Sequence, residues 1–337
     1  MIKINIPRRK RGRQTSEAED RYLYELREFA EAILEIDSTL DFKVSSRGWC
    51  YILENESGLL KSDFDKAQVK INECRKAGLL PMDICAMDEA REFSCLEEIG
   101  AEPKEEAGSL VQRVLATIKD YSPISFWQGQ EYYLQMLVEK IDLRTLFEPI
   151  CQKYHIAIAN TKGWSDLNQR YDMMCRFKYW ESQGKQCVLL YCGDFDPDGK
   201  LISDTLMKNM VDVMDAVKWS PASVQIDRFG LNEDFIIRFD LSWIDGLVTG
   251  GGKDLADTGH KRHYADYIQD WLKTYGARKV ESNALVVRPK AGRNLCEKAI
   301  CQYVRASAPN KFQTQIEPYR EKLLNQFKIR FKALGKQ

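Results

Sequence analysis

Residues 186–204, QCVLLYCGDFDPDGKLISD, contain the pattern that decides the fold. An apolar run, VLLYC, is followed by a glycine and then by three aspartates within five residues: Asp194, Asp196 and Asp198. A buried strand that ends in carboxylates and continues into a helix is typical of a site at the carboxyl edge of a parallel sheet. Carboxylates this close repel one another unless a divalent cation, Mg²⁺ or Mn²⁺, lies among them. The pattern therefore predicts a metal site, and a solvated acidic turn is the simpler alternative.

The composition indicates an ordinary globular protein. The 337 residues are enough for two or three domains, and they are 44% hydrophobic and 30% charged with a formal net charge of zero. No apolar run is long enough to span a membrane and no signal-peptide core is present, so we expect no membrane association. The ten cysteines lack CxxC spacing, which argues against zinc or a disulfide framework and predicts thiols in a reducing cytoplasm.

Residues 1–15 form a basic tail. The stretch MIKINIPRRKRGRQ carries six basic residues and no acidic one. Five of these lie close together and are candidates for contacts with DNA phosphates: Arg8, Arg9, Lys10, Arg11 and Arg13. A disordered solubilising tail would have the same composition.

Residues 16–100 have the pattern of a winged helix-turn-helix domain. We expect helices over 17–38, 45–55 and 62–77 and a strand over 79–88. Ser16 begins a capping box for the first helix, and Ser62 is the expected cap of the third. Lys66 and Lys70 lie on the outward face of the third helix and are candidates for contacts with double-stranded DNA. Acidic residues on the same face weaken this prediction, and many such modules bind only proteins.

After a connector over 101–123, residues 124–337 are predicted to form an α/β domain with a helical C-terminal extension. We expect strands over 132–138, 155–161, 188–192 and 223–231, with helices over 142–154, 166–182 and 200–217. Such alternation is typical of a small, mostly parallel sheet with helices on both faces. We interpret the loop 249–254 as mobile and His260 and His263 as surface residues.

Glu139 supplies a further carboxylate for the predicted site. It ends the apolar strand of QMLVEK, as Asp194 and Asp196 end theirs. The carboxyl ends of parallel strands meet at one edge of the sheet, so these three carboxylates are expected to converge there. No structural requirement would place three carboxylates on one edge, which favours a functional site.

This order of motifs resembles the Toprim domain, in which a strand ending in Glu and a Gly-containing loop precede a strand ending in DxD. Here the loop is TKGWSDL, and GDFDPDG resembles more narrowly the topoisomerase VI A subunit and the meiotic double-strand-break transesterase. The winged-helix domain of that family carries a catalytic tyrosine in RxxYY or RxxFY, and SSRGWCYILE places Arg47 and Tyr51 at that spacing. GARKVESNALVV resembles the family's KxExxAL segment through Lys279, Glu281, Ala284 and Leu285. The resemblance runs from about residue 20 to about residue 305.

The resemblance implies metal-dependent cleavage of both DNA strands by transesterification. Tyr51 would attack a backbone phosphate, and Arg47 would help to activate a phenol whose ordinary pKa is about 10. Mg²⁺ or Mn²⁺ at Glu139, Asp194 and Asp196, with Asp198 as a further ligand, would stabilise the developing charge. In the relatives the tyrosine of one subunit works with the metal site of another, which implies a homodimer. A separate ATPase subunit is a candidate partner.

Two residues depart from the family pattern. Cys50 replaces the usual first aromatic residue of the pair, and Asp198 stands where an aromatic residue or His is usual. An alternative that keeps the metal site is a hydrolytic Toprim nuclease, as in winged-helix Toprim proteins of plasmid and phage defence systems. There a metal-bound water attacks, and Tyr51 would be an ordinary core residue. A third hypothesis is a DNA-binding or assembly subunit whose acidic site is vestigial.

Overall fold

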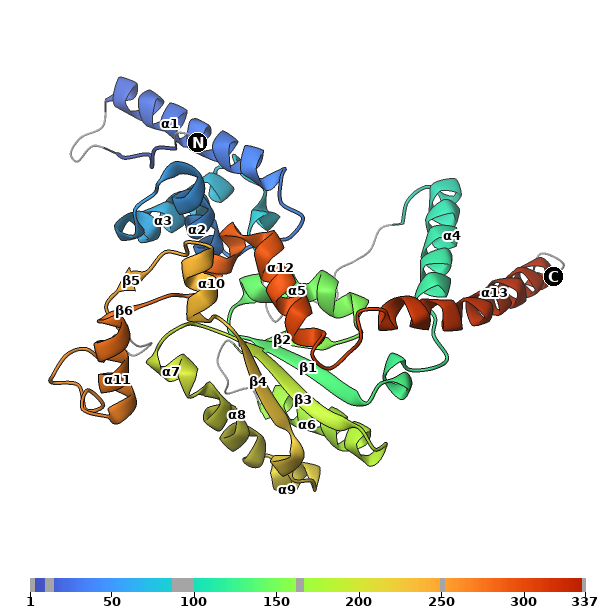
Figure 1. Cartoon of the computed structure of the whole chain (residues 1–337). Coiled ribbons are helices and arrows are strands. Elements are labelled where there is room, and N and C mark those ends of the chain that lie inside the picture. The colour runs from blue at the N-terminus through green and yellow to red at the C-terminus, as the bar shows by residue number, and fades with distance from the viewer. Residues whose placement is uncertain (1–3, 10–14, 87–99, 162–166, 249–251, 335–337) are drawn as a thin grey trace.

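The computed structural model describes residues 4–9, 15–86, 100–161, 167–248 and 252–334. In the view of Figure 1 its N-terminal helices lie above a four-stranded parallel sheet, and two long helices project from the other side of the body. The predicted α/β class with a parallel sheet is confirmed. None of the helices in the described ranges combines the length and hydrophobicity needed to cross a bilayer.

The N-terminal part is built from the three predicted helices, which surround a common apolar core. They are α1 (Ser16–Asp37), α2 (Ser46–Ser57) and α3 (Phe64–Lys76), with the 3-10 turn η1 (Lys61–Asp63) before α3. Apolar residues at helical spacing on α1, such as Leu26, Phe29 and Ile33, are buried against α3. Two predicted caps were wrong. The hydroxyl of Thr15, in place of Ser16, accepts the bond from Ala18 N, and α3 begins at Phe64 without a side-chain cap.

The strand predicted over 79–88 is wrong for the residues that the structure describes. Residues Met82–Ile84 form a 3-10 turn, η2, and the only pairing of this described segment is a parallel bridge between Val44 and Cys85. Pro81 has no N–H to donate to a neighbouring strand, which disfavours a strand here. The apolar residues that suggested the strand, such as Leu80 and Ile84, lie in the core instead.

The four sheet strands have the order β2-β1-β3-β4, and all of them are parallel. They are β1 (Tyr132–Val138), β2 (Ala157–Asn160), β3 (Gln186–Cys192) and β4 (Gln225–Gly230). Helices α5 (Ile141–Lys153) and α12 (Pro289–Ile300) cover one face, and α6 (Leu167–Ser182) and α8 (Ile202–Val211) cover the other (Figure 1). Burial from both faces explains the mostly apolar sequences of β1 and β3, in which Gln135 is a buried polar exception.

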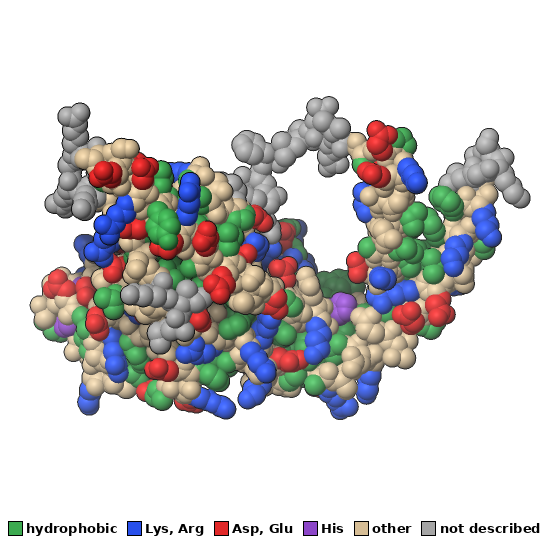
Figure 2. Space-filling view, turned by 90° about the horizontal axis from the view of Figure 1, so that it is seen from above, with side chains coloured by type: hydrophobic (Ala, Val, Ile, Leu, Met, Phe, Trp, Pro, Cys, Tyr) green, Lys and Arg blue, Asp and Glu red, His purple; other side chains and the backbone are tan. Residues whose placement is uncertain are grey.

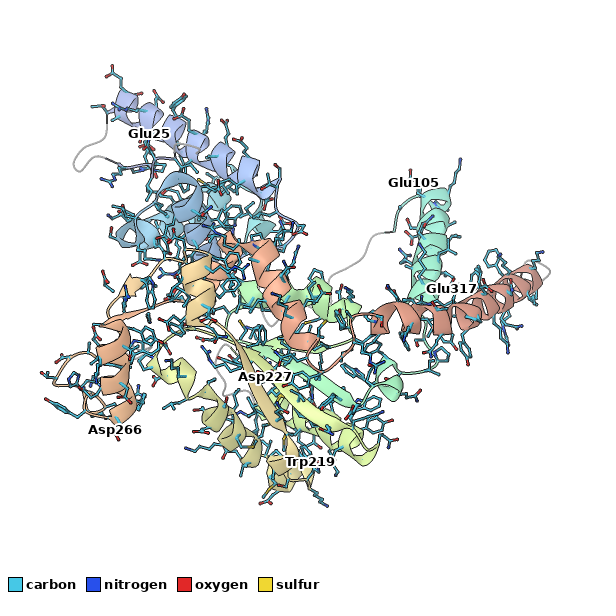
Figure 3. The ribbon with its side chains drawn as sticks, viewed as in Figure 1. Glu25, Glu105, Trp219, Asp227, Asp266 and Glu317 are labelled. Atoms are coloured by element: carbon cyan, nitrogen blue, oxygen red, sulfur yellow. The ribbon has the colours of Figure 1, made fainter. Side chains whose placement is uncertain are left out.

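The helix predicted over 200–217 is divided into three. The structure has α7 (Pro197–Lys200), α8 and α9 (Met214–Val217). The chain then passes through the 3-10 turn η5 (Pro221–Ser223) into β4. In Figure 3, Trp219 marks the end of the sheet where β4 begins, and Asp227 lies within that strand.

The chain after β4 is mainly helical, as predicted. It contains α10 (Glu233–Arg238), α11 (Asp266–Tyr275), the 3-10 segment η6 (Ser282–Val287), α12 and α13 (Ala308–Leu334), with β5 (Ile244–Asp245) pairing antiparallel to β6 (Arg278–Lys279). Helix α13 packs against α4 (Pro103–Asp120), which lies in the predicted connector; η4 (Phe126–Gly129) leads from it into β1. Glu105 and Glu317 label these two projecting helices in Figure 3.

His263 is a further correction. It is buried, with Nδ1 3.0 Å from the Leu255 carbonyl oxygen, so it is part of the core and not a surface residue. The loop 249–254 was predicted to be mobile, and its residues 249–251 lie outside the described part of the chain.

Candidate active site at the carboxylate edge of the sheet

Glu139 and Asp194 come together at the carboxyl edge of the sheet. Strand β1 pairs with β3 so that Val138 is opposite Cys192, which brings the residues after both strands to the same level. The Glu139 N–H donates to the Cys192 carbonyl, and Glu139 Oε2 accepts a 2.8 Å hydrogen bond from Asp194 N. The two carboxylates that we predicted from separate strands are therefore direct neighbours.

Asp194 is held on three sides. Its Oδ1 accepts hydrogen bonds of 2.8 Å from both the N–H and the hydroxyl of Ser282, at the start of η6. Its Oδ2 lies 3.0 Å from the Lys140 ammonium, and Arg228 donates to its carbonyl oxygen. Burial raises the pKa of Asp194 to about 6; the charge of Lys140 opposes this shift, and that of Glu139 adds to it.

The Lys140 ammonium occupies the point on which the two carboxylates converge. Its Nζ is 2.6 Å from Glu139 Oε1 and 3.0 Å from Asp194 Oδ2. Burial acts to lower the pKa of Lys140, but the two carboxylates outweigh it and the pKa is raised. Lys140 was not among the predicted site residues, and its only signal in the sequence was its position directly after Glu139.

The other two predicted aspartates point to different partners. Asp196 is the N-cap of α7, where its Oδ1 accepts a bond from Gly199 N, and burial together with the charge of Asp194 raises its pKa. Asp198 forms a two-point ion pair with Arg262, at 2.9 and 3.0 Å. The carboxylate of Asp198 therefore faces Arg262 and not the point between Glu139 and Asp194, and its role as a metal ligand stays a prediction.

Glu139 and Asp194 form a donor set that suits a hard divalent cation. Mg²⁺ is usually held by one or two carboxylates with several waters, and the ammonium of Lys140 marks a position where these two oxygens already hold a cation. Among the described residues, no three His, Cys, Asp or Glu side chains are grouped closely enough to hold a metal. A divalent ion at this position would therefore have two carboxylate ligands, and the Lys140 ammonium would have to leave the position between them.

Gly193 makes the close approach of the two strand ends possible. A Cβ at this position would lie 2.5 Å from the Tyr191 hydroxyl and 2.8 Å from Glu139 Oε2. Both distances are too short for non-bonded atoms, so a side chain at residue 193 would displace the Glu139 carboxylate. The glycine of the GDFDPDG motif thus leaves the space in which the Glu139 carboxylate and the Tyr191 hydroxyl lie.

Tyr51 lies beside this edge, but it is buried. It is 1% exposed, and its hydroxyl donates a 2.7 Å hydrogen bond to Glu281 Oε2, to which Arg47 Nε lies at 3.4 Å. Burial is the main cause that raises the pKa of Tyr51, Glu281 raises it further, and Arg47 opposes both. The predicted nucleophile is therefore a protonated phenol that faces a carboxylate.

Two consecutive residues, Glu281 and Ser282, link Tyr51 to Asp194 at the edge of the sheet. Glu281, which accepts from Tyr51, is followed by Ser282, which donates to Asp194. The resemblance implied that the tyrosine works with the site of another subunit, whereas in this chain Tyr51 lies next to its own carboxylate edge. The Glu281 of the KxExxAL resemblance thus connects α2 to the candidate site.

The predicted DNA-binding cations in the described residues mostly have carboxylate partners. Arg9 pairs with Glu19 at 2.9 Å, Lys66 with Asp63 at 2.6 Å, and Lys70 with Glu73 at 2.8 Å. Arg8 is exposed, and Lys10, Arg11 and Arg13 lie outside the described residues. Figure 2 shows positive and negative side chains interspersed over one face of the molecule. The described residues of this group therefore give little net positive charge for DNA.

A comparison with profiles of known protein families gave no match, and neither did a comparison with curated protein sequences.

Proposed function

We propose that this chain is a metal-dependent enzyme that cleaves phosphodiester bonds of double-stranded DNA at the edge formed by Glu139 and Asp194. One observation carries the proposal: carboxylates from two separate parallel strands converge on a single cation position. A divalent metal bound there would stabilise the charge that develops on a phosphate. The Toprim-like order of the motifs and the helix-turn-helix pattern of α1, α2 and α3 support duplex DNA as the substrate.

The residues of this edge are arranged before any ligand binds. Ser282 fixes one oxygen of Asp194, and the Asp194 N–H fixes one oxygen of Glu139. Arg228 holds the turn by donating to the carbonyl oxygens of Asp194 and Gly199. Oxygen ligands held in place in this way need no rearrangement of their own during reaction, which is the main contribution a protein makes to such chemistry.

Hydrolysis by water is the route that the geometry favours. A tyrosine that attacks phosphorus must lose its proton, and burial and Glu281 both make this harder for Tyr51. We propose that Tyr51 is a positioning residue, whose hydroxyl holds Glu281 and through it the segment that binds Asp194. This assigns the protein to the hydrolytic alternative.

Transesterification through Tyr51 is the second candidate. It is favoured by two cations beside the ring, since Lys61 Nζ lies 4.5 Å and the Arg47 guanidinium 5.8 Å from its centroid. These charges would stabilise a phenolate once the hydroxyl left Glu281. A separate ATPase subunit belongs to this second candidate alone.

A homodimer is part of the proposal for either route, because two sites are needed to cut both strands in one encounter. We also propose a cytoplasmic location. It is supported by the cysteines in the described part of the chain, which are all free and mostly buried, as expected in a reducing compartment.

Supercoiled plasmid incubated with the purified chain tests the proposal. Mg²⁺ should produce nicked and linear DNA, EDTA should prevent this, and Glu139→Gln should abolish it. Glu297→Gln is the matched control, because Glu297 pairs with Lys153 on the surface at the other end of α5. Equal cleavage by wild type and Glu139→Gln would remove this edge from the reaction.

Denaturant quenching separates the two routes. Under hydrolysis the DNA ends are free of protein, and Tyr51→Phe retains cleavage within about tenfold of wild type, since it loses only a positioning bond. Under transesterification the quenched wild type remains attached to a DNA end, and Tyr51→Phe is inactive. Attached protein would overturn the hydrolytic assignment.

A further inference from the structure

Each carboxylate at the edge uses one oxygen for a fixed hydrogen bond and directs the other at Lys140. Asp194 Oδ1 is bound to Ser282, and Glu139 Oε2 is bound to the Asp194 N–H. The remaining oxygens, Asp194 Oδ2 and Glu139 Oε1, both contact the Lys140 ammonium, at 3.0 and 2.6 Å. Removal of the ammonium would therefore leave two oriented oxygens around one vacant cation position.

Lys140 can leave this position without disturbing the fold. Its main chain is fixed as the residue before α5, where its carbonyl accepts from the N–H groups of Leu143 and Arg144. Its side chain is 31% exposed to solvent, and its ammonium is a compact charge at the end of a flexible four-carbon chain. The ammonium can thus swing into solvent while the two carboxylates keep their other partners.

We propose that Lys140 is a tethered cation that occupies the metal position between Glu139 and Asp194 until a divalent ion displaces it. The proposal rests on the proposed metal site. It assigns Lys140 the role of a residue that sets metal affinity, because a divalent ion and the ammonium cannot occupy the same point and would repel each other if both stayed. In the metal-free protein Lys140 neutralises two adjacent carboxylates, and once displaced it remains within reach of an anionic phosphate at the same edge.

Direct Mn²⁺ binding to the full chain without DNA, measured by electron paramagnetic resonance, tests this role. Lys140→Met and Lys140→Gln remove the charge, and Lys140→Arg keeps it. If Lys140 fills the position in about nine molecules of ten, the two neutral variants should bind Mn²⁺ about tenfold more tightly than wild type. Lys140→Arg should bind no more tightly than wild type.

Lys153→Met is the matched control, because Lys153 is the last residue of the helix that Lys140 precedes and also pairs with a glutamate, Glu297, but far from the edge. It should bind Mn²⁺ as wild type does. Thermal melting provides a second measurement: added Mn²⁺ should raise the melting temperature of Lys140→Met more than that of wild type, since tighter binding stabilises the folded state more.

Equal or weaker Mn²⁺ binding by both neutral variants, with binding by wild type intact, would overturn the role of Lys140 and leave the proposed metal site standing. Mn²⁺ binding by none of the proteins would overturn both. Tighter binding by Lys153→Met to the same degree would show a general effect of charge and would also overturn the role of Lys140.

Discussion

Tyr51→Phe should destabilise the protein, because the Tyr51 hydroxyl is part of the link between α2 and the edge of the sheet. The substitution removes one oxygen and leaves the ring, whose edge-to-face contact with Phe64 is unchanged. What is lost is a buried 2.7 Å hydrogen bond to the Glu281 carboxylate. A bond to a charged group contributes about 1.5–3 kcal/mol, and since Arg47 still reaches the same oxygen at 3.4 Å, we expect a loss of about 1.5–2 kcal/mol.

The loss should depend on pH in a defined direction. Burial alone would raise the pKa of Glu281, but the Tyr51 hydrogen bond and the charge of Arg47 outweigh it, so the pKa lies below its ordinary value of 4.5. A carboxylate whose pKa is lowered in the folded state stabilises the protein at pH values above its ordinary pKa, and this stabilisation is lost as the pH falls through the lowered pKa. The difference between wild type and Tyr51→Phe should therefore be full at neutral pH and shrink below pH 4.5.

Urea denaturation followed by circular dichroism at pH 7 measures this loss as a lower midpoint with an unchanged slope. The matched control is Tyr24→Phe, which removes a 2.7 Å hydrogen bond to Glu28 from a tyrosine that is 60% exposed. This control should change stability by less than about 0.5 kcal/mol, because water replaces the lost partner. Equal effects of the two substitutions would refute the structural role of Tyr51.

Three further predictions concern individual carboxylates. Asp142→Ala should lower the free energy of unfolding, measured by urea denaturation, by about 2–3 kcal/mol, because buried Asp142 accepts hydrogen bonds from the N–H and hydroxyl of Ser45 at the start of α2. Asp83→Ala, at an exposed carboxylate, should change it little. Mn²⁺ affinity, measured from pH 7.5 to pH 5, should fall below pH 6 by up to about tenfold per pH unit. Metal binding needs the deprotonated Asp194, and the pKa of Asp194 is raised to about 6; an affinity that does not change with pH would contradict this. Asp198→Asn should keep its Mn²⁺ affinity within about threefold of wild type in the same titration, since Asp198 is paired with Arg262 near the surface, and a loss as large as that of Asp194→Asn would restore it as a ligand.

The parts of the fold that are encoded in local periodicity were predictable. The apolar runs before Glu139 and Asp194 correctly indicated parallel strands that end at one edge, and the 3.6-residue spacing of apolar residues located α1 and α3. Thr15 and Ser16 both carry a hydroxyl that can cap a helix, and the predicted cap of α1, Ser16, was wrong by one residue. The strand expected at 79–88 is wrong for its described residues, because alternation alone does not account for the missing N–H of Pro81.

The partners of the site residues could not be predicted, since they come from distant parts of the chain. Asp194 is bound by Ser282, which lies 88 residues away, and Tyr51 by Glu281, which lies 230 residues away. The spacing of three aspartates gave no sign that Arg262 takes Asp198 out of the group. Lys140 was visible in the sequence, but its meaning depends on the side-by-side register of β1 and β3.

Cleavage of a linear DNA duplex by wild type and Asp194→Asn, side by side in the same Mg²⁺ buffer, tests the central claim most directly. Circular dichroism melting should first establish that both proteins are folded, because Asp194→Asn keeps an oxygen that can accept from Ser282. We predict that wild type cleaves the duplex and that Asp194→Asn is slower by about 100-fold or more, the loss expected when a preorganised ligand for the reacting charge is removed. Equal rates for the two folded proteins, or no cleavage by wild type with Mg²⁺ or Mn²⁺, would contradict a metal-dependent DNA-cleaving site at this edge.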